Sequence, residues 1–208
     1  MARRGPRGDL SGDRILQAAD DLVTERGDVA AVSLRMLADR LGVTANALYT
    51  YYPSLADIVH DLADRRLGRL GIEELLTGQA GQGAGAFCPH CALVELLRRA
   101  QTLYASPGTL ALLKAGPVLG PHSFRLSESV MTLCEGARLN PRDCHDLIMG
   151  WFYGSATLLA EGWTSGTDAL RQMAEIRDRF PRIADRPAPD PEAQFTAILD
   201  GLGIRHRG

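Results

Sequence analysis

Residues 33–52 constrain the fold of this chain more than any other segment. Their first half carries apolar residues at helical spacing and ends at Leu41. Gly42 follows, and its missing Cβ permits a tight turn. A second short helix is expected from about Thr44, with Leu48 facing the core. This pattern is typical of a helix-turn-helix, whose second helix enters the major groove of DNA.

The rest of the chain also has helical patterns, and no segment alternates as a strand would. A first helix is expected from about Asp13 to Arg26, where Gly27 ends it. Ser54 opens a capping-box pattern, which predicts a long helix that reaches about Leu76 and connects two domains. Further helices are expected across residues 91–105, 108–115, 121–136, 141–163 and from 191 onward. We therefore predict an all-α fold with an N-terminal three-helix domain.

Bulk properties exclude several classes of protein. No run of about 18 apolar residues occurs, and the N-terminus lacks the apolar stretch of a signal peptide, so we expect a cytoplasmic protein with no membrane partner. No phosphate loop, nucleophile elbow or metalloenzyme spacing is present, which predicts no enzyme activity and no cofactor. The net charge of −2 does not favour DNA by itself, so a basic arm containing Arg3 and Arg4 should matter.

Several side chains in the segment 33–52 are candidates to contact DNA, together with the basic arm. Side chains on the second helix would face base edges, where Asn46 suits adenine and Ala45 suits a thymine methyl group. Tyr49, Tyr51 and Arg35 are more plausible contacts to phosphates. Tyr52 is expected in the core. The predicted DNA-binding residues are Arg3, Arg4, Arg35, Thr44, Ala45, Asn46, Tyr49, Thr50 and Tyr51.

This segment resembles the DNA-binding domain of the TetR family of transcriptional repressors. The family carries a run similar to Leu-Ala-x-x-Leu-Gly-Val-x-x-x-x-Leu-Tyr-x-Tyr-Phe-x-Ser-Lys, and residues 37–55 here read Leu-Ala-Asp-Arg-Leu-Gly-Val-Thr-Ala-Asn-Ala-Leu-Tyr-Thr-Tyr-Tyr-Pro-Ser-Leu. The match covers about residues 11–60. One position departs from it: where the family often has a phosphate-binding Lys, this chain has Leu55. The resemblance implies a DNA-binding regulator whose affinity depends more on the basic arm, on Arg35 and on helix N-terminal amides.

A weaker resemblance extends over residues 91–204. Leu103-Tyr104, the Leu139-Asn140-Pro141 helix entry and Gly154 are similar to the C-terminal domain of the tetracycline-repressor type. That domain is a helical unit that binds a ligand and dimerises. The tetracycline repressor holds a magnesium–tetracycline complex partly through a His in a short helix. The corresponding residues 110–113 here contain no His, so neither tetracycline nor magnesium is expected as a ligand.

The resemblance therefore implies two domains. Residues 1–52 are predicted to be the helix-turn-helix DNA-binding domain, and residues 53–208 a helical C-terminal ligand-binding and dimerisation domain. The helix expected over 141–163 is apolar almost all round and must be covered on several sides. With the last helix it would form a four-helix interface in a homodimer; an ordinary core helix of a monomer is the alternative.

An effector cavity should be largely apolar with a few polar groups, and aromatic side chains of the second domain are candidates to line it. Each of them is individually more often a core residue. The predicted ligand-binding residues are Tyr104, His122, Phe124, Met131, Trp151, Phe152 and Trp163.

Cys88-Pro89-His90-Cys91 has a spacing that suits metal binding and thiol exchange. Ordinary thiols are the commonest explanation, and no metal is assigned to the chain. A metal site with Cys88, His90 and Cys91 and a redox sensor remain as alternatives.

Together these patterns predict a ligand-responsive transcriptional regulator. In this hypothesis a homodimeric repressor binds a palindromic double-stranded DNA operator, and a small, largely apolar effector releases it. One alternative is a metal- or thiol-responsive repressor that senses through Cys88 and Cys91. A helical enzyme or binding module without DNA function is the other.

Overall fold

Side chains at the helix starts explain why these residues form helices. Ser11 accepts a hydrogen bond from the Arg14 amide at the start of α1 (Gly12–Arg26), and Ser54 accepts one from the Asp57 amide at the start of α4 (Leu55–Gly68). Asp190 caps α13 (Pro191–Leu202) in the same way, with Pro191 in its first turn.

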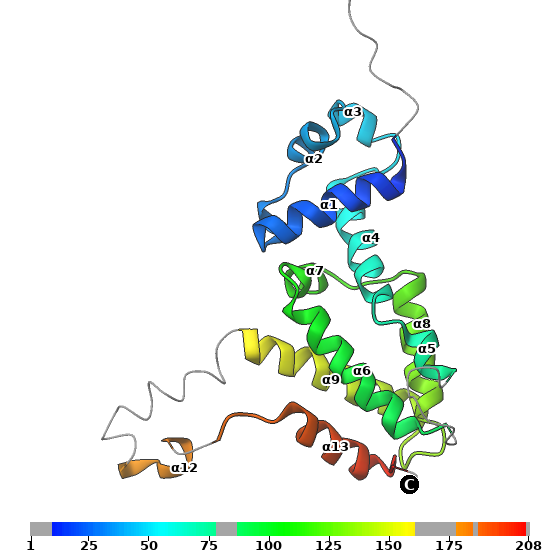
Figure 1. Cartoon of the computed structure of the whole chain (residues 1–208), viewed down its shortest axis with the longest axis vertical. Coiled ribbons are helices and arrows are strands. Elements are labelled where there is room, and N and C mark those ends of the chain that lie inside the picture. The colour runs from blue at the N-terminus through cyan, green and yellow to red at the C-terminus, as the bar shows by residue number, and fades with distance from the viewer. Residues whose placement is uncertain (1–9, 78–86, 161–177, 185–186, 207–208) are drawn as a thin grey trace, which may run out of the picture. The chain divides into compact units, whose positions relative to one another are not determined.

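The computed structural model describes residues 10–77, 87–160, 178–184 and 187–206 (Figure 1). No β-strand occurs in these ranges, so the predicted all-α fold is confirmed. None of the described helices is long and apolar enough to cross a membrane. The remaining helices are η1 (Val29–Ala31), α2 (Leu34–Leu41), α3 (Ala45–Leu48), α5 (Ile72–Leu76), α6 (Pro89–Ala105), α7 (Thr109–Lys114), α8 (Pro121–Leu133), α9 (Pro141–Ala160) and α12 (Pro181–Ala184).

The chain divides into two compact units. The first unit comprises residues up to Ile72 together with Thr102–Leu126, and the second comprises Glu73–Gln101 together with residues from Ser127 onward. The sequence predicts a functional boundary between residues 52 and 53, and that boundary stays a prediction. The first compact unit extends beyond it and includes α4 and α7, because α4 packs on α1 and on α7.

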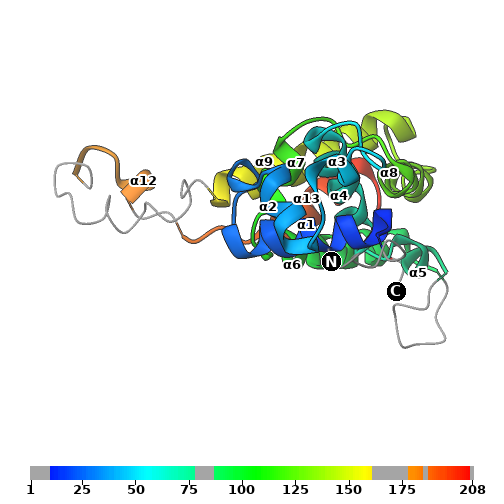
Figure 2. The same ribbon diagram turned by 90° about the horizontal axis from the view of Figure 1, so that it is seen from above.

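The first unit has an apolar core beneath the helix-turn-helix. Ile15 of α1, Leu37 of α2 and Leu48 of α3 are completely buried, as are Ile58 and Leu62 of α4. Helices α1 and α4 lie side by side in both views (Figures 1 and 2). Burying such aliphatic side chains contributes about 1.5–3 kcal/mol each, so the apolar stripe of α4 holds the helix-turn-helix in place.

A buried ion pair crosses the same junction. The Arg66 guanidinium, 1% exposed, lies 2.7 Å from the Asp20 carboxylate of α1. It also donates to the Thr109 hydroxyl at 2.6 Å and to the Pro107 carbonyl at 2.8 Å, at the start of α7. Arg69 makes a second ion pair with Asp20. One buried arginine of α4 therefore joins α1 to α7.

Asp64, one turn before the C-terminal end of α4, is also buried, but it pairs with backbone amides and not with a charged side chain. Its carboxylate accepts hydrogen bonds from the backbone amides of His122 and Ser123, at 3.2 and 2.8 Å, in the first turn of α8. A carboxylate at a helix start satisfies amides that have no partner within the helix. The backbone must come close for this, because a Cβ on Gly120 would stand 2.3 Å from the Asp64 carboxyl carbon.

The predicted single connector helix to Leu76 is wrong. Helix α4 ends at Gly68, and α5 begins only at Ile72. Gly71 between them has φ +58, in the left-handed region that glycine adopts at little cost, so the chain turns there instead of continuing the helix.

In the second unit, α9 packs on α13 through aromatic side chains. The Phe195 ring of α13 stacks on Trp151 at 5.0 Å and on Phe152 at 5.1 Å between centroids. Phe152 and Phe195 are buried. This confirms the last helix as the packing partner of the apolar helix that begins at Pro141.

Replacing Arg66 with Ala should lower the free energy of unfolding by about 3 kcal/mol or more, because Asp20 keeps only the partly exposed Arg69 and Thr109 loses its donor. Urea denaturation at a fixed protein concentration measures the loss. Arg65→Ala is the matched control: Arg65 lies on the same helix but is more than a third exposed, and its loss should stay below about 1 kcal/mol. Equal losses in the two variants would contradict the structural role of Arg66.

Candidate DNA-binding face, cavity and thiol cluster

The turn of the helix-turn-helix is built by Gly42. It has φ +67, and its amide donates to the Asp39 carbonyl, while the Val43 amide reaches the Ala38 carbonyl at 3.0 Å. These bonds close the end of α2 in the manner of a left-handed helix cap. Helix α3 then begins with Thr44 as its N-cap residue, as the sequence predicts.

Helix α3 and the turn that follows it, up to Thr50, have a buried side and an exposed side. Leu48 is completely buried, which confirms its predicted core position. Asn46 and Thr50 are exposed, and Tyr49 is 52% exposed, a high fraction for a large aromatic ring. Exposed large aromatic residues on a polar helix face are typical of binding surfaces.

Other predicted DNA contacts are placed as follows. Thr44 and Arg35 are exposed, and Ala45 is half-buried. No ion pair of Arg35 occurs within the described ranges, so its charge faces solvent. Arg3 and Arg4 lie outside the described residues, and their predicted role in a basic arm stays a prediction.

Tyr51 and Tyr52 tie the end of this motif to the start of α1. The Tyr51 hydroxyl donates to the Leu10 carbonyl at 2.6 Å, so its proton is already in use. Tyr52 is half-buried, close to Gly12, and its hydroxyl bonds to Asp61. Burial, followed by the charge of Asp61 and that hydrogen bond, raises the pKa of Tyr52 to about 12, so the phenol stays neutral.

An apolar cavity of about 460 Å³ lies within the first unit. Its walls come from η1, α4, α7 and the segment after α7, and His60 is its one titratable side chain. This volume falls within the range of small-molecule sites, about 300–1,000 Å³. The lining residues are Val29, Ala30, Leu55, Ala56, Val59, His60, Ala63, Leu112, Ala115, Gly116, Pro117 and Val118.

None of the predicted ligand-binding residues lines this cavity. Trp151 and Phe152 pack on Phe195, and the His122 ring lies against α4 at Gly68. Phe124 is 56% exposed, Tyr104 and Met131 are half-buried, and Trp163 lies outside the described residues. The prediction favoured large aromatic rings, whereas small and aliphatic side chains leave this space open.

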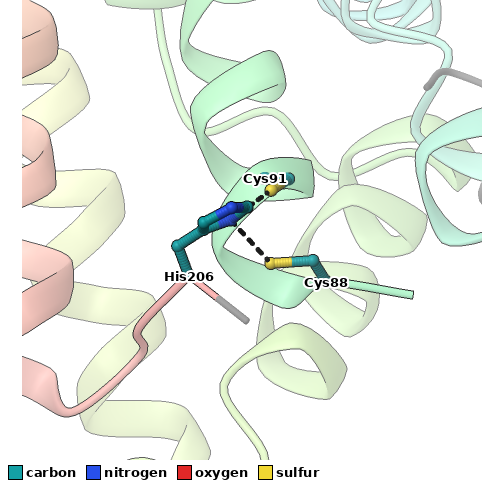
Figure 3. A group of neighbouring side chains, drawn as sticks. All are labelled: Cys88, Cys91 and His206. Carbon is teal, nitrogen blue, oxygen red and sulfur yellow. Dashed lines mark hydrogen bonds between the residues drawn. The ribbon is translucent and has the colours of Figure 1, made fainter. Parts of the chain in front are cut away.

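A second group of side chains brings Cys88 and Cys91 together with His206 (Figure 3). Their ligand atoms lie within 4.8 Å of one another, and none of the chain's cysteines forms a disulfide. His90, the histidine named in the sequence alternative, is not part of the group; its ring centroid lies 6.0 Å from that of His206. Burial, then hydrogen bonding to Cys88 and its charge, raise the pKa of Cys91. A raised pKa disfavours a reactive thiolate.

Comparison with known proteins identifies the class. Residues 15–62 match the model of "Bacterial regulatory proteins, tetR family". The repressor DrrR1 of Streptomyces coeruleorubidus, an HTH-type transcriptional repressor, is 29% identical over 97% of this chain and 80% of its own length. The protein is thus a helix-turn-helix regulator of transcription that binds DNA.

Solved structures agree on the fold. Apo ActR from Streptomyces coelicolor is 19% identical and superposes with a TM-score of 0.72 over 96% of each chain. ActR in complex with actinorhodin has a TM-score of 0.71 and 18% identity over 94% of this chain and 97% of that one. Residues 15–62 therefore match the TetR family, and the chain as a whole is similar to a transcriptional repressor of the helix-turn-helix type. These comparisons give no support to the metal- or thiol-responsive alternative.

Sequence patterns had no means of finding three features. Asp20 and Arg66 are 46 positions apart, and each looks like an ordinary surface charge on its helix. The cavity is defined by the absence of bulky side chains between helices. His206 lies 115 positions from Cys91 and belongs to no local motif.

Proposed function

We propose that this protein represses transcription as a homodimer on a palindromic operator and is released by a small, largely apolar molecule. The observation that carries the proposal is the exposed polar face of α3, with Tyr49 and Asn46 outward above buried Leu48. A short helix with such a face, on a turn matched by the family, fits the major groove.

Roles on the DNA follow from side-chain chemistry. Asn46, Thr44 and Thr50 carry groups that hydrogen-bond base edges, and Ala45 suits a thymine methyl group. Tyr49 and Arg35 contact phosphates and set the register. Tyr51 contributes less than predicted from the sequence, since its hydroxyl proton is held by the Leu10 carbonyl. Its main role is to fix the end of the motif against α1.

Two helices of the second unit support a dimer. On α9, Leu147, Gly150, Gly154 and Leu158 are exposed and recur at helical spacing, and a Cβ on either glycine would meet nothing within 4 Å. On α13, exposed small residues form a similar stripe at Ala193, Ala197 and Gly201. Small residues let helix backbones approach closely. These stripes suit a second copy of the chain in a symmetric four-helix contact.

The cavity of the first unit is the proposed effector site. It is apolar, with His60 as a polar group, and it touches both η1, beside the helix-turn-helix, and α4. ActR has been solved in complex with actinorhodin and with (S)-DNPA, which favours a small organic effector here. Release requires an effector that prefers the DNA-incompetent arrangement, since equal affinity for both arrangements shifts nothing.

Replacing Tyr49 with Ala should weaken operator binding by at least about a hundredfold. A hydrogen bond to a charged group is worth about 1.5–3 kcal/mol, and the loss enters once for each protomer of the dimer. Gel-shift titration against the DNA upstream of the protein's own gene measures the affinity.

Phe124→Ala is the control for this variant, because it removes a comparably exposed aromatic ring outside α3. Sedimentation should give the same oligomeric state for both variants and the wild type. If Tyr49→Ala binds the operator like the wild type, the assigned reading face is wrong.

Filling the cavity should separate ligand binding from DNA binding. Val59→Phe places a ring in the proposed effector site, so saturable binding of the fluorescent probe 1-anilinonaphthalene-8-sulfonate should weaken at least about tenfold, the order expected when a pocket contact worth about 1.4 kcal/mol is lost. Operator affinity should change little.

Leu119→Phe introduces the same ring on the neighbouring exposed surface and should leave probe binding unchanged. Unaltered probe binding by Val59→Phe would place the effector site elsewhere.

A further inference from the structure

We propose that Cys88, Cys91 and His206 form a binding site for one zinc ion per chain. The three side chains come from the start of α6 and from the tail after α13, both within the second unit. Figure 3 shows the two sulfur atoms and the imidazole ring facing a common point. Nothing in the proposed DNA-binding role requires this site, so the proposal stands independently.

The distances between these atoms fit a tetrahedral ion. Zinc–sulfur bonds of about 2.3 Å and zinc–nitrogen bonds of about 2.0 Å place a sulfur and a nitrogen ligand about 3.6 Å apart. The His206 Nδ1 atom lies 3.7 Å from the Cys88 sulfur and 3.1 Å from the Cys91 sulfur. The two sulfur–nitrogen distances lie within about half an ångström of this value, and all three ligand atoms lie within 4.8 Å of one another.

The chain holds the ligands in place before any ion arrives. Cys88 precedes the first turn of α6 and Cys91 lies within it, with the Ala92 amide bonded to the Cys88 carbonyl at 3.1 Å. At the other end, the Ile204 amide bonds to the Leu199 carbonyl at 2.9 Å, and Ile204 itself is buried. His206 therefore follows an anchored residue by only two positions.

An exposed ion pair also links the two supporting helices. Arg98 of α6 lies 2.7 Å from the Glu192 carboxylate of α13.

Cys91 and His206 are exposed and Cys88 is half-buried, so an ion can enter from solvent and keep a water molecule in its fourth position. Both thiols lose their protons to solvent on binding, and the imidazole binds through its neutral form.

The chemistry selects zinc over harder ions. Two sulfurs and one imidazole nitrogen suit Zn²⁺, whereas Mg²⁺ and Ca²⁺ prefer oxygen ligands. Bound zinc would hold the C-terminal tail against α6. Because the ion binds the folded state, it should raise the thermal midpoint of unfolding.

Cobalt titration of the reduced, chelator-treated full-length protein tests the proposal. One equivalent of Co²⁺ per chain should produce the thiolate-to-cobalt charge-transfer absorption and the visible bands of tetrahedral cobalt, and zinc should displace both. Cys88→Ser combined with Cys91→Ser should abolish them. His206→Ala should weaken binding by more than about tenfold, since even outer-shell changes at zinc sites cost 10–100-fold.

His122→Ala is the matched control, because it removes an exposed histidine of the first unit and should leave binding unchanged. A chain shortened to end at Arg205 should behave like His206→Ala. At one zinc concentration, the unfolding midpoint should rise more in the wild type than in His206→Ala or in the shortened chain. Absence of the thiolate band at one equivalent, or wild-type affinity in His206→Ala, would overturn the assignment.

Discussion

The buried ion pair between Asp20 and Arg66 is the interaction on which the arrangement of the first unit depends. Removing two charges from water costs several kcal/mol per ion, and the pair is tolerated only if its other hydrogen-bonding groups are satisfied. Arg66 meets this condition, since each of its three nitrogens has a partner: Nε donates to Asp20, and the other two donate to the Pro107 carbonyl and to the Thr24 and Thr109 hydroxyls. Such a site accepts one geometry and thereby sets how α1 lies on α4.

This ion pair and its neighbours connect the helix-turn-helix to the rest of the first unit through a series of packed and hydrogen-bonded helices. Helix α1 supports α2 and α3, while α4 is bonded to α7 through Arg66 and to the first turn of α8 through Asp64. The proposed effector cavity lies against the same α4. A ligand bound there would act on the helix that packs on α1, and α1 in turn packs on α2 beside the proposed DNA-reading face; such coupling is the physical requirement for linked binding.

Local patterns were sufficient for the elements and for part of the site. Gly42, the Ser and Asp caps, and the burial of Leu48 all follow from interactions within a few residues, so they are readable from sequence. The break at Gly71 was missed because an apolar stripe can continue across two helices that share a core. Pairings such as Asp20 with Arg66, or Cys91 with His206, depend on the tertiary fold and leave no local trace. The predicted ligand-binding residues do not line the cavity for a related reason: aromatic residues indicate packing as readily as binding, as Trp151 and Phe152 on Phe195 show, and their role in ligand binding stays a prediction.

Native-state hydrogen exchange tests most directly whether α1 and α4 form one cooperative body. Amides at residues 15–23 of α1 and 58–66 of α4 should exchange through a single shared opening, with one free energy and one denaturant dependence. An opening of α1 at distinctly lower free energy, with α4 still protected, would contradict the account, because the helix-turn-helix could then move independently of the helix that lines the proposed effector cavity.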